Sequence, residues 1–325
     1  MHTSTFFRLF PPPKFLAMKH AGLDISDEAI HCLEYHGNAS NTKVEKYARF
    51  DLPPGLIEGG EFRNEEALVQ LLTTFNKKYH LSYVKVSIPE EKVYLFQTDV
   101  PSNDTAEVRQ NIEFKLEENV PLPASEALFS FDLMPISVTK GTLRASVSVV
   151  PQAYILQYMH ILERAGMSAI EFEVVPKSIA RAAIPHESEK THLIVHMMKY
   201  KTGLYIISDG VVCFTSTVGN GAQAGTEADG PAYVANLSKE INRVYQYWGS
   251  HGGAESPIQS VLLTGAHAAH FESQLQNIIT SAVVPVQTAH VWQNVFNIDK
   301  YVPPISQEES LDYAVAAGLA MNLLI

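Results

Sequence analysis

The sequence predicts an α/β protein built from two similar halves, the first of which is interrupted by an inserted α+β unit. Two observations lead to this prediction. A run of three strands, a helix and a further strand stands near the N-terminus, and three consecutive strands return beyond Pro176. Between them lies a unit of different order, namely strand, helix, two strands and helix. A repeated β-meander followed by helices is typical of an internal duplication.

The composition is that of a large folded protein. The chain has 325 residues, of which 46% are apolar, so it can bury a core in two domains or one bipartite domain. The formal net charge of -11 argues against a general nucleic-acid binder. No apolar stretch reaches the roughly 18 residues that cross a bilayer. Cys32 and Cys213 lie far apart without a C-x-x-C spacing, so we expect no disulfide framework and a reducing compartment.

The first half begins after an N-terminal arm, residues 1–18, that we expect to be flexible. Asn64 is placed to cap a helix whose apolar positions between 67 and 75 follow the i, i+3, i+4, i+7 spacing. Strands are predicted around it at 22–26, 29–35, 43–52 and 84–88.

The inserted unit starts after Pro89. Asp104 and Glu107 form a capping-box pattern that opens a helix, which Pro121 and Pro123 end. A second helix, 154–162, stops at a turn with Gly166. Strands are predicted at 93–100, 128–134 and 142–150.

The second half repeats the opening pattern. Turn residues separate its first three strands, and a strand at 260–264 runs directly into Gly265. Ser306 and Glu309 form a capping box at the start of a closing helix. The other predicted elements are strands at 192–198, 203–208 and 211–218 and helices at 233–248 and 271–278.

Several short motifs, taken in their order and spacing, resemble one known family. They are Gly22-Leu-Asp-Ile-Ser-Asp27, Ile88-Pro89, Glu117-Glu-Asn-Val-Pro-Leu-Pro123, Ala165-Gly166, Leu263-Thr-Gly265 and Ala316-Ala-Gly-Leu-Ala320. From about residue 18 to residue 325 the chain is similar to the PilM family of type IV pilus assembly proteins, which resembles FtsA. The resemblance implies an actin-like, ribonuclease H-like duplicated fold, whose two lobes close on a nucleotide.

The resemblance also implies a division of the chain. The N-terminal arm is followed by the first lobe, which is interrupted by a pilus-type subdomain and completed after it, and then by the second lobe. The closing helix returns to the first lobe. The implied boundaries are 1–18, 19–90, 91–168, 169–188, 189–305 and 306–325.

In that family the first hairpin holds a nucleotide phosphate and a magnesium-bound water. The matching positions here are Asp24, Ser26 and Asp27, and Asp24 is the candidate for the metal. The second phosphate hairpin should carry Asp-x-Gly, but His196-Met-Met198 stands there, followed by Thr202. Without a second carboxylate, hydrolysis of ATP is not expected. The two turn lysines, Lys199 and Lys201, are interpreted as solvent-exposed.

The adenosine side of the implied site comprises Gly265 and the polar residues Glu240 and Arg243. The same Glu and Arg, three residues apart, are equally well explained as an exposed helix pair. ATP or ADP with magnesium is therefore the implied cofactor of a degenerate site.

The resemblance implies a cytoplasmic scaffold that lies at the inner membrane through a partner. That partner is a PilN-like membrane-spanning protein, whose N-terminal cytoplasmic tail would lie extended in a groove between the first half and the insertion. Strand residues Val93, Leu95 and Phe96 are candidates for lining this groove, although a buried strand explains them too. Self-association stays open, and no nucleic acid is expected.

Two other functions remain as alternatives. One is an ATP-binding enzyme of the actin-like superfamily, either an ATPase or a small-molecule kinase. The other is an FtsA-like filament that binds membrane directly through a C-terminal amphipathic helix.

Overall fold

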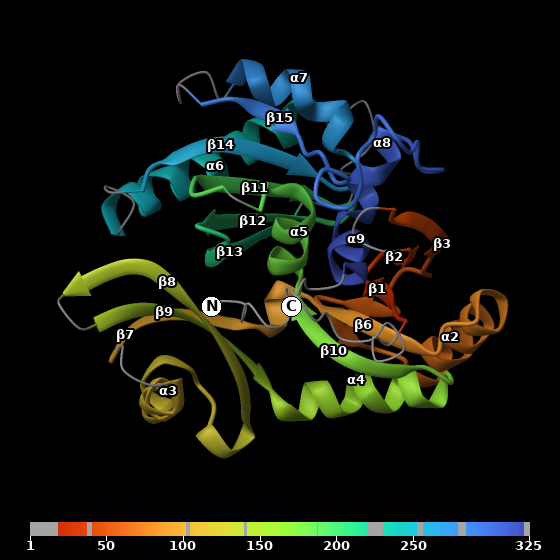
Figure 1. The fold of residues 1–325 in the computed structure, drawn as a ribbon, viewed down its shortest axis with the longest axis horizontal. Coiled ribbons are helices and arrows are strands. Elements are labelled where there is room, and N and C mark those ends of the chain that lie inside the picture. The colour runs from red at the N-terminus through yellow and green to blue at the C-terminus, as the bar shows by residue number, and fades with distance from the viewer. Residues whose placement is uncertain are drawn as a thin grey trace.

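The structure is a computed structural model that describes residues 19–37, 41–101, 105–139, 142–186, 188–219, 230–251, 256–278 and 284–321. Two five-stranded sheets lie one above the other in Figure 1, and an inserted sheet with its own helix stands beside them. None of the helices in these residues is both long and apolar enough to span a membrane.

The first sheet has the strand order β10-β6-β1-β2-β3. The strands β1, β2 and β3 are antiparallel neighbours, whereas β6 pairs parallel with both β1 and β10. Its members are β1 (Ala21–Ile25), β2 (Ala29–His36), β3 (Lys43–Asp51), β6 (Tyr83–Ile88) and β10 (Ser168–Val174). The strands predicted at the N-terminus are confirmed within one or two residues.

The second sheet repeats this topology in the order β13-β12-β11-β14-β15. Again three antiparallel strands are followed by two parallel ones. Its members are β11 (Thr191–Met197), β12 (Lys201–Ser208), β13 (Val211–Gly219), β14 (Ile258–Thr264) and β15 (Val286–Thr288). Because both sheets share one strand order and one pattern of directions, the predicted duplication is confirmed.

Helices cover each sheet through amphipathic faces. In α2 (Glu65–Tyr79) the Asn64 side chain accepts a hydrogen bond from the amide of Ala67, which confirms the predicted cap. Apolar residues of α2 and α4 (Gln152–Arg164) bury against the first sheet. The helices α6 (Gly230–His251) and α7 (Ala268–Ile278) do the same for the second sheet.

Two short helices, α5 (Val175–Ala183) and α9 (Ala314–Ala320), cross between the sheets. They pack closely because Gly318 lies against the backbone of Ser178, where an added Cβ would fall 1.8 Å from the carbonyl oxygen. Before α9 come α8 (Gln307–Ser310) and the 3-10 helix η5 (Leu311–Tyr313). The predicted capping box of Ser306 and Glu309 is present at α8.

The insertion forms a three-stranded sheet in the order β7-β9-β8. One face of this sheet packs on α3 through apolar residues that include Val147 and Ile112. Its elements are β7 (Tyr94–Pro101), α3 (Thr105–Asn119), η3 (Ala124–Glu126), β8 (Ala127–Thr139) and β9 (Thr142–Pro151). The remaining short elements are β4 (Ile57–Glu58), β5 (Glu61–Phe62) and η2 (Glu90–Lys92).

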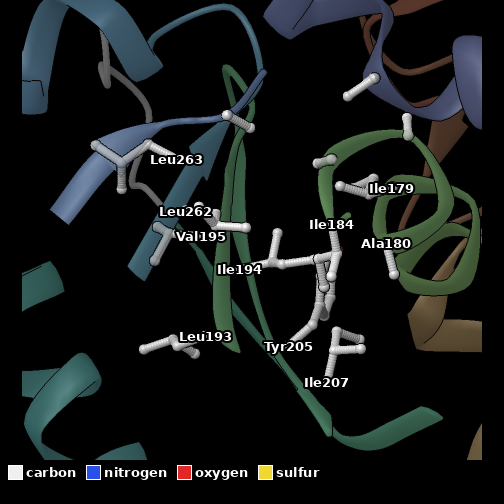
Figure 2. Close-up of a cluster of buried hydrophobic side chains, with 14 of the residues drawn as sticks. Ile179, Ala180, Ile184, Leu193, Ile194, Val195, Tyr205, Ile207, Leu262 and Leu263 are labelled. Atoms are coloured by element: carbon white, nitrogen blue, oxygen red, sulfur yellow. The ribbon is translucent and has the colours of Figure 1, made fainter. Parts of the chain in front are cut away.

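Side chains in the middle of β11 alternate between the two faces of the second sheet. Figure 2 shows Ile194 pointing toward Ile184 at the end of α5, whereas Leu193 and Val195 point to the opposite side of the sheet. All three β11 residues are fully buried, so the middle of the strand is covered on both faces.

The elements that were not predicted from the sequence are β10, α5 and β15, together with the short β4, β5, η2 and η3. The capping residue expected at Asp104 lies outside the described residues. The lobe boundaries stay a prediction, although β10 pairs with β6 and thereby returns the chain to the first sheet.

Candidate functional site

The hairpin turns of the two sheets meet directly. One turn joins β1 to β2 and the other joins β11 to β12. The Glu28 Oε2 atom of the first turn accepts a hydrogen bond of 2.7 Å from the backbone N–H of Lys199 in the second. Burial raises the pKa of Glu28, and the bond from Lys199 opposes that rise.

Lys201 is buried, with 8% of its surface exposed, so the interpretation of this residue as a solvated turn lysine is wrong. Its Nζ lies 2.5 Å from Glu91 Oε1 and 3.7 Å from Asp27 Oδ2, both supplied from the first-sheet side. Burial alone lowers the pKa of Lys201, but the charges of Glu90, Glu91 and Asp27 outweigh it and raise the pKa. The ammonium therefore stays charged in the cleft. Lys199, in contrast, is exposed as expected.

The carboxylates of the first hairpin have partners within the chain. Asp24 is buried and accepts a hydrogen bond of 2.7 Å from Ser87, while burial raises its pKa. Asp27 accepts the backbone N–H groups of Gly59 and Gly60 at 2.9 and 3.1 Å. These contacts occupy the groups that would hold a hydrated cation.

The hydroxyl groups predicted near the phosphates are also engaged. Ser26 Oγ donates to the carbonyl of Ala29 and accepts from that residue's N–H, which closes the β1–β2 turn. Thr202 Oγ1 lies 2.8 Å from the hydroxyl oxygen of Tyr233 on α6.

Gly265 has a φ of +91° and lies against β11, where an added Cβ would fall 2.4 Å from the carbonyl oxygen of Met197. Its N–H donates to the carbonyl of Leu311 at 2.8 Å. The chain itself therefore packs on both sides of this glycine.

Glu240 and Arg243 pair on the surface of α6 at 2.5 Å, and the Arg243 side chain is 72% exposed. The structure thus gives these two the geometry of an exposed helix pair.

Magnesium nucleotide does not fit this set of residues. Among the described residues no group of three or more His, Cys, Asp and Glu could hold a metal ion. Carboxylates outnumber permanent cations around the two turns, which disfavours a polyphosphate. The carboxylates are Asp24, Asp27, Glu28, Glu90, Glu91 and Asp312, and the cations are Arg49, Lys199 and Lys201.

A groove, here called the β10 groove, lies between the insertion and the free edge of β10. It encloses about 340 Å³. One wall is the face of β8 and β9 that points away from α3, and the other is formed by β10 and Lys177 of α5. Since β10 ends its sheet in the described residues, the backbone N–H and C=O groups of its outer edge have no neighbouring strand. The lining residues on β8, β9 and β10 are Leu128, Phe129, Ser130, Asp132, Ser146, Ser148, Val150 and 171–174.

The charged residues of the β10 groove are mostly acidic. Asp132 lies 2.7 Å from Lys177, and Glu171 lies 2.8 Å from Lys85. Glu173 is buried and binds Arg181. Although each carboxylate has a basic partner, Lys177 is the one basic residue among those that line the groove.

Val93, Leu95 and Phe96 line a different groove, here called the β7 groove, of about 580 Å³. This groove separates β7 from β13 and α6 of the second sheet. Leu95 packs against the core of the second sheet, whereas Phe96 packs into the core of the insertion. None of the three predicted partner residues lines the β10 groove, although Val93 packs against the cluster of Ile88, Val150 and Ile155, which do line it.

A further cavity, of about 690 Å³, lies at the opposite ends of the strands from the β1–β2 and β11–β12 turns. Tyr35 at the end of β2, Arg181 of α5 and the Asp209–Gly210 turn are among its lining residues. The Tyr35 hydroxyl is buried there and has no hydrogen-bond partner within the described part of the chain.

A five-stranded topology present twice, joined by crossing helices and carrying one inserted unit, defines a protein of the actin-like class. The sequence model of the family described as "Type IV pilus assembly protein PilM" matches residues 22–228, more than half of the chain. The chain therefore belongs to the PilM family of type IV pilus assembly proteins.

Solved structures agree on the fold. A structure titled "PilM-PilN type IV pilus biogenesis complex" is similar with a TM-score of 0.76 and 19% identity, covering 93% of this chain and 98% of that chain. The ethanolamine utilization protein EutJ from Carboxydothermus hydrogenoformans is similar with a TM-score of 0.51 and 11% identity, covering 95% and 90%. At such identities the likeness speaks for the fold alone. No curated protein matches the sequence.

Proposed function

We propose that this protein is a cytoplasmic scaffold of a type IV pilus or related assembly platform, and that it binds the N-terminal tail of a PilN-like membrane-spanning partner. Membership of the PilM family and the similarity to the PilM-PilN structure support the assembly role and the kind of partner. Through that partner the scaffold would lie at the inner membrane.

The β10 groove is the proposed binding site, and the free edge of β10 is the observation that carries this proposal. An extended peptide can add to such an edge as a further strand, because the edge offers unpaired backbone donors and acceptors at regular spacing. The face of β8 and β9 then supplies pockets for alternate side chains, from Leu128 and Val150 to Ser130 and Ser148.

The charge of the groove suits a basic tail. Cytoplasmic segments next to a membrane span carry an excess of Lys and Arg. The acidic side chains Asp132, Glu171 and Glu173 lie along the groove, where a basic tail would meet them. Their existing partners would be shared or exchanged with the tail on binding.

Tail binding by this route needs no nucleotide. The cleft between the hairpin turns is separate from the β10 groove, and its residues do not fit magnesium nucleotide. No observation favours the alternative of an ATPase or kinase, since His196 and Met198 stand where the second phosphate hairpin would need Asp and Gly.

The test is binding of a fluorescent synthetic peptide with the sequence of the partner's N-terminal tail, measured by anisotropy with the full chain. Ser148→Trp fills the β10 groove and should weaken binding by about tenfold or more, which is about 1.4 kcal/mol or more. Thr215→Trp places the same side chain in the β7 groove and should leave the affinity unchanged.

A scrambled peptide is the control for sequence-specific recognition. Equal binding of the tail and its scramble would overturn the proposed function. Loss of binding in Thr215→Trp with retention in Ser148→Trp would instead assign the tail to the β7 groove, as the strand with Val93, Leu95 and Phe96 predicts.

A further inference from the structure

We propose that the two halves of this protein are held closed by the chain's own charges, with Glu28 as the anion and Lys201 as the cation between the hairpin turns. These two side chains take the roles that a bound phosphate and a hydrated metal ion would otherwise have in the cleft. The contacts that Glu28 and Lys201 make between the turns are here called the latch. The latch does not involve the proposed partner, so the latch and the proposed function can each be disproved separately.

The anionic part of the latch is a contact from the first turn to the second. Turns of this kind expose backbone N–H groups that attract anions. Here the N–H of Lys199 is taken by Glu28 at 2.7 Å, across 171 residues of sequence. A carboxylate oxygen on a backbone N–H is a charge-assisted hydrogen bond, which is stronger than a bond between neutral groups.

In the cationic part of the latch, the second sheet supplies the side chain, Lys201, and the first-sheet side supplies its partners. Lys201 belongs to β12 of the second sheet, yet its partners Glu91 and Asp27 belong to the first-sheet side. Because Lys201 is buried, removing it would leave carboxylates facing one another in a partly desolvated cleft. Asp27 is itself fixed by the N–H groups of Gly59 and Gly60, so its carboxylate cannot turn away without losing them.

A third contact spans the same gap. Thr217 Oγ1 on β13 donates to Glu90 Oε1 at 2.9 Å, next to the carboxylate that binds Lys201. Together the three contacts join the β1–β2 turn and the segment after β6 to three neighbouring positions of the second sheet. The side chains of the protein therefore make the contacts that hold the two halves closed, and no ligand is required.

Pulsed electron paramagnetic resonance can measure the closure. Spin labels at Thr74→Cys in α2 and Ser273→Cys in α7 report the distance between the halves, because both positions are exposed and each helix packs on one sheet. The parent should give one narrow distance distribution that millimolar magnesium ATP leaves unchanged. Lys201→Met and the isosteric Glu28→Gln should each broaden it or shift it to longer distances.

Lys85→Met is the matched control, since Lys85 is equally buried at 8% exposure but pairs with Glu171 within the first sheet. Its distribution should match the parent. Circular dichroism establishes that each variant is folded, and Glu28→Gln keeps the test valid if Lys201→Met does not fold. Parent-like distributions in folded latch variants, equal broadening in Lys85→Met, or a shift of the parent with magnesium ATP would overturn the proposal.

Discussion

The Nε2 atom of His31 lies 2.9 Å from Oδ2 of Asp312, although 281 residues separate them in the sequence. Arg49 on β3 also donates to this carboxylate, and both His31 and Asp312 are largely buried. Burial alone lowers the pKa of His31, but the bond to Asp312 and the charges of Asp312 and Asp24 raise it overall. Burial raises the pKa of Asp312, whereas His31 and Arg49 lower it overall. The pair fastens the segment before α9 to the first sheet.

Asp312→Asn should lower the free energy of unfolding by about 2–3 kcal/mol in mild acid. The stabilisation from His31 is complete below its unfolded pKa of about 6.5 and is lost as pH rises through the raised folded pKa. The stabilisation from Asp312 is present above about 3.9 and is lost as pH falls through its lowered pKa. Urea unfolding near pH 5.5 should therefore show a larger penalty than near pH 8.5. Asp299→Asn, at an exposed position, should show none. A penalty independent of pH would contradict the pairing.

His196 should make the protein sensitive to acid. Burial lowers its pKa to about 4, and its Nδ1 lies 3.0 Å from Thr264 Oγ1. In the unfolded state the His196 side chain binds a proton near pH 6.5, whereas in the folded state it stays neutral down to about pH 4. The free energy of unfolding therefore falls by about 3 kcal/mol as pH drops from about 6.5 to 4. His196→Asn should remove this part of the slope in urea titrations across that range. An unchanged slope would show that other groups cause the acid sensitivity.

Much of the fold could be predicted from local signals. The caps at Asn64 and Ser306 and the apolar spacing of α2 are short-range features, and both caps are confirmed. The segment with β10 and α5 was missed because Pro176, interpreted as a boundary, occupies the first turn of a helix, where proline is well tolerated. The strand β15 has three residues and is defined by its pairing with β14, which the local sequence does not reveal.

The site was harder to predict because its decisive contacts are long-range. Nothing near Lys201 in the sequence reveals that Glu91 and Asp27 surround it. The free edge of β10 likewise follows from strand order, which no local pattern encodes. The strand with Leu95 and Phe96 was predicted correctly, but which groove it faces depends on how the insertion packs.

The close crossing of α5 and α9 should tolerate no side chain at Gly318. Gly318→Ala places a Cβ on the backbone of Ser178, which cannot give way like a flexible side chain. We expect a loss of about 3 kcal/mol or more in thermal or urea unfolding. Gly249→Ala in α6 is the matched control. Nothing lies within 4 Å of its added Cβ, so a gain of about 0.5–1 kcal/mol is expected. Equal effects of the two substitutions would be inconsistent with the close helix contact.

Both cysteines should react slowly in the native protein. Burial raises the pKa of Cys32 and that of Cys213 to about 12, so the reactive thiolate is scarce at pH 8. Titration with a chromogenic disulfide reagent should label neither thiol rapidly in buffer and both in urea. Rapid labelling of Cys213 in buffer would indicate that the junction of β13 with the insertion opens readily.

The most direct test of the scaffold account is hydrogen–deuterium exchange of the full chain with and without the partner's N-terminal tail peptide. Addition of a strand to the β10 edge predicts slower exchange in residues 168–174 and in β8, with β7 and α6 unchanged and no effect of a scrambled peptide. Protection confined to β7 and α6, or equal protection by the scramble, would contradict it.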